Sequence, residues 1–250
     1  MPRFFVSPET VRDKFAVLTG EAAAHGKVLR LRRGDTVTLC AGDGMEHTGT
    51  VSDVSPDQIS VVIHRTDSAV SEPGLRCAVY MALAKSDKLE HVIQKATELG
   101  AWEIVAFPSA RSVARLEERS SEKKLDRWRK IAASAAEQSG RGIVPRVTLL
   151  SSMAAAVERA AKADLPLFLY ENEDRLSLRR ALPEVFPATA SVMTGPEGGF
   201  EPEEVALAKT AGMRICTLGP RILRCETAPL CALSALMFAA GELEEIQREG

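Results

Sequence analysis

The chain has 250 residues, of which 45% are hydrophobic and 26% are charged, and its formal net charge at pH 7 is −2. This composition is typical of a globular protein that buries a core in one large domain or two smaller ones. A net charge so near zero gives no overall sign of nucleic-acid binding, so any RNA-binding surface has to be a local patch.

The cysteines and the N-terminus favour a reduced, cytoplasmic protein. The five cysteines are odd in number and have no CxxC spacing, which argues against a disulfide framework and against a zinc or redox site. Residues 1–20 contain five charged side chains and no uninterrupted apolar run, so they do not form a secretory signal. The longest apolar stretch, about residues 230–240, is too short to span a bilayer. We therefore expect a soluble protein without a metal ion.

The first quarter of the chain has the pattern of a small β-barrel. Short runs rich in Val, Leu and Thr alternate with turn signals, and the expected strands are at residues 36–39, 48–51 and 59–63. A short helix is expected at residues 20–29. Residues 67–74, where Ser, Glu, Pro and Gly replace the apolar pattern, mark a boundary. We predict a first domain over residues 1–70 and a second over residues 74–250.

From residue 75 onward strands alternate with helices. The expected strands are at residues 77–83, 103–107, 165–170, 190–194 and 214–218. The expected helices are at residues 86–99, 120–139, 202–211 and 226–244. Ser86 is expected to cap the first of these helices, and Gly100 to end it. Such alternation predicts an α/β fold with a mostly parallel sheet and helices on both faces.

The first motif that carries chemistry is TGPEGGF at residues 194–200, between a predicted strand and a predicted helix. Its three glycines let a flat ligand approach the main chain, and ligands bind at such strand ends in open α/β sheets. The motif is neither GxGxxG nor GxxxxGK[ST]. Four carboxylates crowd the place where a phosphate would bind, namely Glu197, Glu201, Glu203 and Glu204. S-adenosylmethionine, which has a sulfonium and no phosphate, fits better than a nucleotide di- or triphosphate; a plain tight turn is the alternative.

The second motif is LGPRILRCETA at residues 218–228, again between a strand and a helix. Gly219 and Pro220 turn the chain off the strand, and the next helix starts near Glu226. Arg221 and Arg224 then remain available for charged partners. A local ion pair between Arg224 and Glu226 is the alternative interpretation.

Taken together, the two motifs resemble the C-terminal half of the RsmE family of ribosomal RNA methyltransferases, whose pattern is close to GPEGG and LG.R.LR.ETA. Further matches run in order along nearly the whole chain. They are PRFF at residues 2–5, VLR at 28–30, Lys85 with Lys88 and Leu89, QKATELG at 94–100, RSV at 111–113, and EQS at 137–139 with Arg141. One departure is Cys225, where the family usually has Thr.

The resemblance implies an N-terminal PUA-like β-barrel and a C-terminal SPOUT α/β domain with a deep trefoil knot. It also implies a homodimer that uses S-adenosylmethionine to methylate N3 of a uridine in 16S ribosomal RNA, within the assembled 30S subunit. The apolar C-terminal helix supports a dimer, because Leu230, Leu233, Leu236 and Met237 are more apolar positions than one buried face needs.

The resemblance also implies which residues bind the cofactor: they lie in the two motifs and at the end of an earlier strand. They are Leu169, Tyr170, Glu171, Thr194, Gly195, Pro196, Glu197, Gly198, Gly199, Leu218, Gly219, Arg221, Ile222, Leu223, Arg224, Thr227 and Ala228. Methyl transfer to uridine N3 requires positioning and stabilisation of negative charge on the uracil oxygens. An arginine side chain can stabilise this negative charge without itself changing its protonation state. The catalytic candidates are Arg111, Arg221 and Arg224, with Glu226 orienting one of them.

Two basic stretches are candidates for RNA binding. Residues 111–146 hold ten basic and five acidic side chains, and residues 27–33 form a second basic cluster. On charge alone, a solvated amphipathic helix explains the first stretch. The resemblance instead favours an RNA-binding role for Arg111 and Arg141. The expected RNA-binding residues are Arg3, Lys27, Arg30, Arg32, Lys85, Arg111 and Arg141. The rival functions are a SPOUT enzyme acting on a ribose 2′-oxygen or another base, and a non-catalytic RNA-binding protein.

Overall fold

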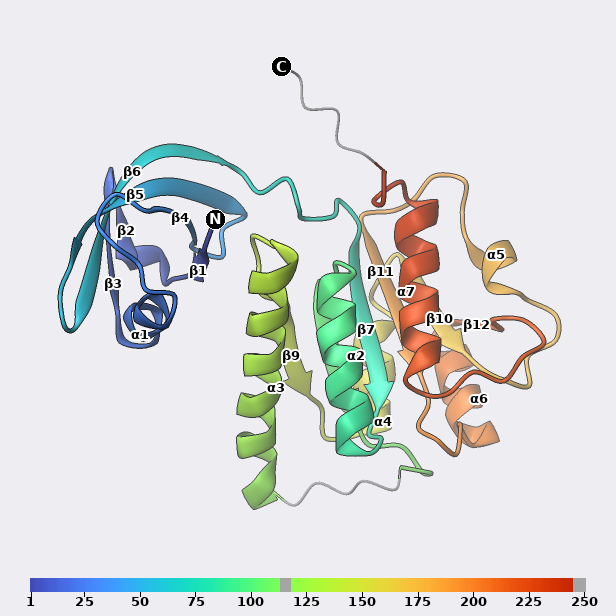
Figure 1. The fold of residues 1–250 in the computed structure, drawn as a ribbon. Helices are drawn as coiled ribbons and strands as arrows, with labels where there is room; N and C mark the ends of the chain where they lie inside the picture. Colours follow the sequence, from blue (N-terminus) through green and yellow to red (C-terminus); the bar gives the residue numbers. More distant parts are fainter. Residues whose placement is uncertain (113–117, 245–250) are drawn as a thin grey trace. The chain divides into compact units, whose positions relative to one another are not determined.

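The computed structural model describes residues 1–112 and 118–244 (Figure 1). The chain divides into two compact units, one formed by residues 1–72 with 136–144, the other by residues 73–135 with the chain from residue 145 onward. Part of the basic stretch after Arg111, including Arg115, lies outside the described residues. Within the described ranges no helix is long and apolar enough to cross a membrane, and no group of His, Cys, Asp or Glu side chains could hold a metal ion.

The first unit is built on one curved six-stranded sheet (Figure 1). The order of its strands is β1-β4-β5-β6-β3-β2; β1 pairs with β4 in parallel, and the other pairs are antiparallel. The elements are β1 (Arg3–Phe5), β2 (Val11–Arg12), β3 (Phe15–Thr19), α1 (Gly20–Val28), β4 (Thr36–Cys40), β5 (Met45–Val54) and β6 (Gln58–Ser68). The expected strands and the short helix are confirmed. In the described residues the edge strands β1 and β2 do not pair, so the sheet is a half-barrel.

Alternating side chains give this sheet its core. In β3, Ala16 and Leu18 are buried while the residues between them are exposed, as expected for a strand with one face on a core. Phe4 and Ile59 pack into the same cluster. At Gly49 the register between β5 and β6 shifts, and a Cβ there would be 2.7 Å from the Val62 carbonyl oxygen. Glycine therefore permits a bulge that helps the long strands curve.

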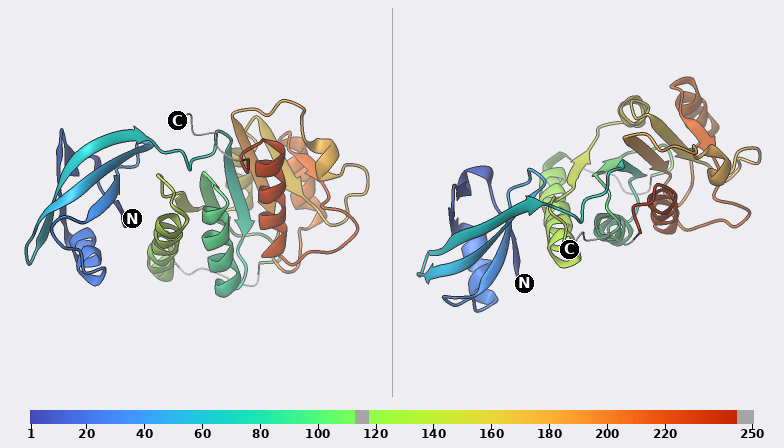
Figure 2. Two further views of the ribbon diagram at one scale, coloured as in Figure 1. Left: turned by 45° about the horizontal axis from the view of Figure 1, so that its top comes forward. Right: turned by 90° about the horizontal axis from the view of Figure 1, so that it is seen from above.

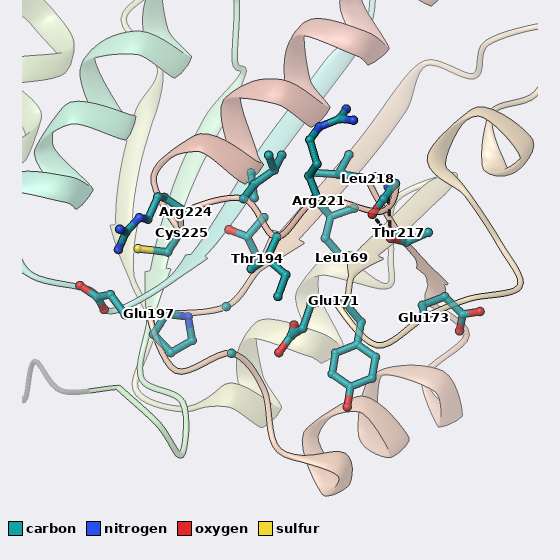
Figure 3. A pocket seen from close by; sticks show the side chains of 18 of the residues that line it. Leu169, Glu171, Glu173, Thr194, Glu197, Thr217, Leu218, Arg221, Arg224 and Cys225 are labelled. Atoms are coloured by element: carbon teal, nitrogen blue, oxygen red, sulfur yellow. Dashed lines mark hydrogen bonds between the residues drawn. The ribbon is translucent and has the colours of Figure 1, made fainter.

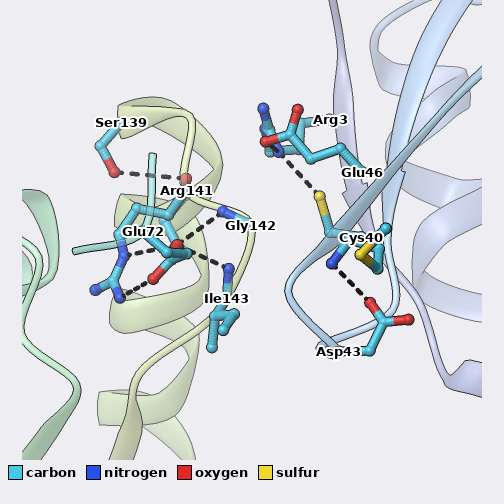
Figure 4. A network of polar contacts seen from close by, with 11 residues as sticks. Arg3, Cys40, Asp43, Glu46, Glu72, Ser139, Arg141, Gly142 and Ile143 are labelled. Atoms are coloured by element: carbon cyan, nitrogen blue, oxygen red, sulfur yellow. Dashed lines mark hydrogen bonds and ion pairs between the residues drawn. The ribbon is translucent and has the colours of Figure 1, made fainter. Parts of the chain in front are cut away.

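The chain between α3 (Glu118–Ser139) and β9 (Arg146–Leu149) is tied to the first unit by Glu72 (Figure 4). The Glu72 carboxylate accepts hydrogen bonds from the Arg141 guanidinium at 2.6 and 3.2 Å. It also accepts from the backbone N–H groups of Gly142 at 2.9 Å and Ile143 at 3.1 Å. The Arg141 side chain is only 3% exposed. The Glu72 carboxylate thus accepts hydrogen bonds from one guanidinium and two backbone N–H groups of a segment about 70 residues further along the chain.

The second unit contains a six-stranded sheet in which all pairs are parallel, in the order β12-β10-β11-β7-β8-β9. Its strands are β7 (Arg76–Ala82), β8 (Glu103–Phe107), β9 (Arg146–Leu149), β10 (Leu165–Leu169), β11 (Thr189–Thr194) and β12 (Arg214–Cys216). Every residue of β8 and β10 is buried. Continuous burial is expected where helices cover both faces of a parallel sheet.

Helices cover both faces of this sheet (Figure 2). They are α2 (Ser86–Glu98), α3 (Glu118–Ser139), α4 (Met153–Ala160), α5 (Leu178–Ala181), α6 (Pro202–Thr210) and α7 (Thr227–Ala239). α2 and α7 pack together on one face, and α4 and α6 pack together on the other. The predicted α/β class, with a mostly parallel sheet, is confirmed; the trefoil knot stays a prediction.

Two helix termini differ from the prediction. The N-cap of α2 is Lys85 rather than Ser86, which lies inside the helix. α7 ends at Ala239 rather than near residue 244, because Gly241 has a φ of +79° and the Glu242 N–H bonds to the Met237 carbonyl oxygen. This is the glycine-dependent Schellman ending. The ending of α2 at Gly100, with a φ of +87°, is confirmed. Strand β9 and the helices α4 and α5 were not predicted.

The apolar residues of α7 are used inside the chain. Leu233, Leu236 and Met237 are fully buried, and Leu230 is half-buried. The excess of apolar positions is therefore explained by packing against α2 and the sheet. Leu233, Leu236 and Met237 are therefore not exposed for a subunit interface, and the homodimer stays a prediction.

Candidate functional site

A pocket of about 830 Å³ lies at the carboxyl ends of β10, β11 and β12 (Figure 3). Because the three strands are parallel, the loops that follow them meet at one edge of the sheet, where open α/β sheets bind ligands. Every residue expected to bind the cofactor lines this pocket except Thr227, the first residue of α7. The lining residues that were not predicted are Lys88, Glu173, Asp174, Thr217, Pro220 and Cys225.

The first wall of the pocket is the segment 194–200, which we call the glycine loop. It begins at Thr194, whose buried hydroxyl donates to the Tyr80 carbonyl oxygen at 3.3 Å. A turn follows in which the Gly199 N–H donates to the Pro196 carbonyl oxygen at 3.0 Å. Gly199 has a φ of +69°, and a Cβ there would collide with the Glu171 carboxylate. This position therefore requires glycine for its backbone conformation and for the close approach of β10's loop.

Arg111 fastens the glycine loop from outside the pocket. Its Nε and Nη2 donate to the two carboxylate oxygens of Glu201 at 2.8 and 3.0 Å, and its Nη1 donates to the Gly198 carbonyl oxygen at 2.9 Å. The Arg111 hydrogen bond and charge lower the pKa of Glu201. Each guanidinium nitrogen thus has a partner in or next to the loop, and Arg111 does not line the pocket.

The start of α6 adds a second attachment. Glu201 and Glu204 form a capping box, in which the Glu204 Oε2 accepts from the Glu201 N–H at 2.9 Å. The Glu204 Oε1 accepts from the Ala110 N–H, also at 2.9 Å. Glu201 and Glu204, which are among the carboxylates expected to disfavour phosphate binding, therefore also accept hydrogen bonds from backbone N–H groups.

The second wall is the segment 217–226, which we call the arginine loop. Gly219 has a φ of +103°, and its N–H donates to the Thr217 hydroxyl at 3.2 Å. Arg221 and Arg224 line the pocket and are exposed, and among the described residues neither side chain has a hydrogen-bond or ion-pair partner. Their guanidinium groups are available to a ligand.

Within the part of the chain that the structure describes, Glu226 does not pair with an arginine. Its Oε2 lies 3.3 Å from the Lys88 Nζ and accepts a hydrogen bond from the Cys225 thiol at 3.2 Å. The expected orienting role and the alternative ion pair with Arg224 are therefore not what the structure contains. Burial, and then the Glu226 carboxylate, raise the pKa of Cys225 to about 11, so this thiol is protonated at neutral pH.

The residues expected to bind RNA differ in their surroundings. Lys27, Arg30 and Arg32 are exposed beside the end of α1, and Lys85 is exposed at the start of α2. By contrast, the Arg3 Nη1 donates to the Glu46 carboxylate at 2.8 Å and the Cys40 sulfur at 2.9 Å. The other two are engaged as described above: Arg141 is buried on Glu72, and Arg111 holds the glycine loop.

Comparison with known proteins assigns the chain to a family. The model of the RNA methyltransferase domain matches residues 71–237, a range that contains the whole pocket. A ribosomal RNA small subunit methyltransferase E from Bacillus subtilis is 38% identical over 227 residues, covering 88% of this chain and 89% of the relative. The chain belongs to the RsmE family. An RsmE from Mycobacterium tuberculosis is 32% identical, with 93% of this chain and 90% of the relative covered.

Solved structures agree with this membership in the RsmE family. An RsmE from Neisseria gonorrhoeae, bound to S-adenosylmethionine, has a TM-score of 0.85 and 31% identity, covering 95% of this chain and 97% of that one. A methyltransferase from Legionella pneumophila, also in complex with S-adenosylmethionine, has a TM-score of 0.84 and 33% identity with the same coverage. The RsmE fold therefore extends over both units, and the expected pairing of a PUA-like sheet with a SPOUT α/β domain is confirmed, whereas the trefoil knot stays a prediction.

Proposed function

We propose that this RsmE family member is an S-adenosylmethionine-dependent methyltransferase that methylates N3 of a specific uridine in 16S ribosomal RNA. The observation that carries the proposal is that a single pocket is lined by both motifs, the glycine loop and the arginine loop. The names of the relatives support a small-subunit ribosomal RNA substrate, and two of the solved structures contain S-adenosylmethionine.

The residues of the pocket fit S-adenosylmethionine. Its volume of about 830 Å³ is within the range of small-molecule sites. A Cβ at Gly195 would be 3.3 Å from the Gly199 backbone, so a side chain there would crowd the turn, whereas glycine leaves the main chain open to a flat ligand. Glu171, Glu173 and Asp174 line the same pocket. These carboxylates suit the positive charge of a sulfonium.

Bound S-adenosylmethionine supplies an electrophilic methyl group. Catalysis by the chain's own residues then consists of positioning uridine N3 and stabilising the negative charge that the uracil oxygens gain as the N3 proton leaves. Arg221 and Arg224 suit this role because both line the pocket and have no partner among the described residues. Arg111 is a positioning residue in this proposal, since its donors hold Gly198 and Glu201.

The two units divide the work in our proposal: the PUA-like domain, residues 1–70, docks RNA, and the SPOUT domain, residues 74–250, holds the cofactor. Lys27, Arg30 and Arg32 are the RNA-binding candidates of the first, because they are exposed and carry no acid between them. Reversing all three charges to Glu should weaken RNA binding by about tenfold at low salt and reduce its salt dependence. Affinity for S-adenosylmethionine should not change, and Arg65→Glu in the same unit is the control. Unchanged RNA binding would remove this cluster from the interface.

We further propose that the protein acts in the cytoplasm as a homodimer on the assembled 30S subunit. A dimer is supported by the resemblance and by exposed apolar side chains such as Phe238, which is 75% exposed at the end of α7. Sedimentation at micromolar concentration tests the dimer, and a profile of monomer alone contradicts it.

Methyl transfer to free 16S RNA and to 30S subunits, compared in one assay, tests whether the assembled subunit is the substrate.

The decisive experiment for the function is mass spectrometry of 16S ribosomal RNA from a deletion strain, before and after treatment with the purified protein. The expected result is the loss and restoration of one N3-methyluridine. A missing 2′-O-methyl group would instead indicate the other SPOUT chemistry. Binding of RNA without binding of S-adenosylmethionine in calorimetry would indicate a non-catalytic RNA-binding protein.

A further inference from the structure

Lys88 contacts both walls of the pocket at once. It lies in the first turn of α2 and lines the pocket. Its Nζ is 3.4 Å from the Glu197 Oε1 and 3.3 Å from the Glu226 Oε2. Glu197 belongs to the glycine loop, and Glu226 ends the arginine loop. A single ammonium group from a helix outside both loops therefore joins two segments that are about 30 residues apart in the sequence.

The three charged side chains are largely shielded from solvent. Lys88 is 20% exposed, Glu197 is 24% exposed and Glu226 is 28% exposed. In such surroundings ion pairs are screened less than on an open surface. The two carboxylates are also held from their other sides. The Lys85 N–H donates to the Glu197 Oε1 at 3.3 Å, and the Cys225 thiol donates to Glu226.

Both carboxylates are ionised at neutral pH. Burial alone would raise the pKa of Glu197, but hydrogen bonds from its own N–H and that of Lys85, together with the Lys88 charge, lower it. The pKa of Glu226 is lowered first by a hydrogen bond from its own N–H, and further by Cys225 and Lys88. Without Lys88 the loops would therefore present two negative charges to each other at a short distance, which is repulsive.

We propose that Lys88 is a positioning residue: it holds the glycine loop and the arginine loop together around the cofactor by bridging Glu197 and Glu226. This role rests on the proposed function, because it makes the closed arrangement of the two loops a condition for tight binding of S-adenosylmethionine. The bridge acts through charge. Any variant that keeps the cation or removes the repulsion therefore keeps the loops together.

The test uses the full chain with four variants. Lys88→Met removes the charge and keeps most of the side-chain volume, whereas Lys88→Arg keeps the charge. Lys88→Met with Glu226→Gln removes the cation and the repulsion together. Lys95→Met is the matched control, because Lys95 lies on the same helix, pairs with Glu98 at 2.7 Å and does not line the pocket.

Calorimetry with S-adenosylmethionine gives the first readout. Lys88→Met should weaken binding by about tenfold, while the single-turnover rate at saturating cofactor should fall by less than about threefold. Lys88→Arg and the double variant should both bind within about threefold of the original chain. Added salt should narrow the difference in affinity between Lys88→Met and the original chain, because salt weakens the repulsion between the two carboxylates that Lys88 no longer pairs. The proposal is overturned if Lys88→Met binds S-adenosylmethionine as tightly as the original chain. It is also overturned if Lys88→Met binds weakly but affinity is restored neither in Lys88→Arg nor by adding Glu226→Gln to Lys88→Met.

Hydrogen exchange of the cofactor-free protein gives a second readout that does not depend on the proposed function. Lys88→Met should speed exchange at residues 194–199 and 217–226 by about fivefold, with no change in β7 or β8, and Lys95→Met should leave both loops unchanged. If the original chain binds no S-adenosylmethionine, the proposed function fails while this readout still tests the bridge. Equal loop exchange in Lys88→Met and the original chain overturns the bridge even if the cofactor binds.

Discussion

The glycine loop and the arginine loop border the same pocket but are constructed in opposite ways. The glycine loop is fixed at its start by Thr194, at Gly198 by Arg111, and at its end by the capping box of α6. The arginine loop exposes its middle, where Ile222 is 87% exposed. A fixed wall suits a cofactor that must always adopt one geometry. A wall with unpartnered cations suits a large anionic substrate that binds after the cofactor. The arginines of this wall can then contact the substrate without first breaking ion pairs within the protein.

The contrast also separates three arginines that the sequence treats alike. Arg111 has a partner at each guanidinium nitrogen, whereas Arg221 and Arg224 have none among the described residues. Arg111 uses three of its five N–H donors on Gly198 and Glu201, and Glu201 already balances its charge, so Arg111 is less available to a developing negative charge than Arg221 or Arg224. The roles of these residues therefore follow from their neighbours rather than from residue type.

The largest expected effect is that of Arg224→Ala. Loss of this guanidinium should reduce the single-turnover methyl-transfer rate by about a thousandfold, because it stabilises charge that develops only in the transition state. The melting temperature should not change, and the dissociation constant for S-adenosylmethionine should stay within about threefold. Arg179→Ala is the control, since Arg179 is exposed in α5 and does not line the pocket. A stable Arg224→Ala protein with near-normal turnover removes Arg224 from the site.

The next effect is that of Gly199→Ala, which tests whether the glycine loop is a fitted wall. A methyl group there would displace the Glu171 carboxylate into the space of the ligand, so affinity for S-adenosylmethionine should fall by about tenfold or more. Gly212→Ala is a matched control, because Gly212 has a φ of +88°, no atom lies within 4 Å of its added Cβ, and it does not line the pocket. Alanine is strained at the positive φ of either position, so the melting temperatures of the two variants should fall by similar amounts. Equal affinities in the two variants would mean that the glycines only form turns.

Gly198 is a less direct probe of the same wall. Its added Cβ would be 3.1 Å from the Arg111 Cβ, so a larger side chain there acts first on Arg111. Gly198→Val should therefore resemble an Arg111 variant rather than a blocked pocket. The comparison requires both proteins to be measured by the same calorimetry and melting experiments.

A moderate effect is expected for Arg111→Lys. Lysine cannot reach Gly198 and both Glu201 oxygens at once, so affinity for S-adenosylmethionine should weaken by about fivefold. Glu201→Gln should cause much of the same loss, and the double variant should lose little more, since the two side chains act as one clamp. If Arg111→Lys instead abolishes methyl transfer while Glu201→Gln is nearly normal, Arg111 contacts the substrate.

How far the sequence could predict this site depends on how local each interaction is. Local rules identified Gly100 as a helix end and both motifs as loops after strands. They missed Lys88, which reaches the pocket only because α2 starts beside the loops, 109 residues before Glu197. Arg141 looked like part of a basic surface, yet Glu72, in a distant segment, buries it. Charge counts along a chain cannot distinguish a free cation from one whose partner is brought close by the fold.

The smallest expected effect is on the pH dependence of stability. Arg111 holds the pKa of Glu201 below its ordinary value of 4.5, and backbone N–H groups together with Lys88 do the same for Glu197, so the unfolded chain binds more protons than the folded chain as pH falls through this region. The stabilisation from these groups is therefore present above about pH 4.5 and is lost as the pH drops through the lowered pKa values. Melting temperatures measured from pH 7 to pH 3 should show a shallower acid decline for Glu201→Gln than for the original chain, by only a few degrees because the side chain is 37% exposed. Identical pH profiles would mean that the Arg111 clamp positions the glycine loop without stabilising the fold, leaving its effect on cofactor affinity as the only consequence.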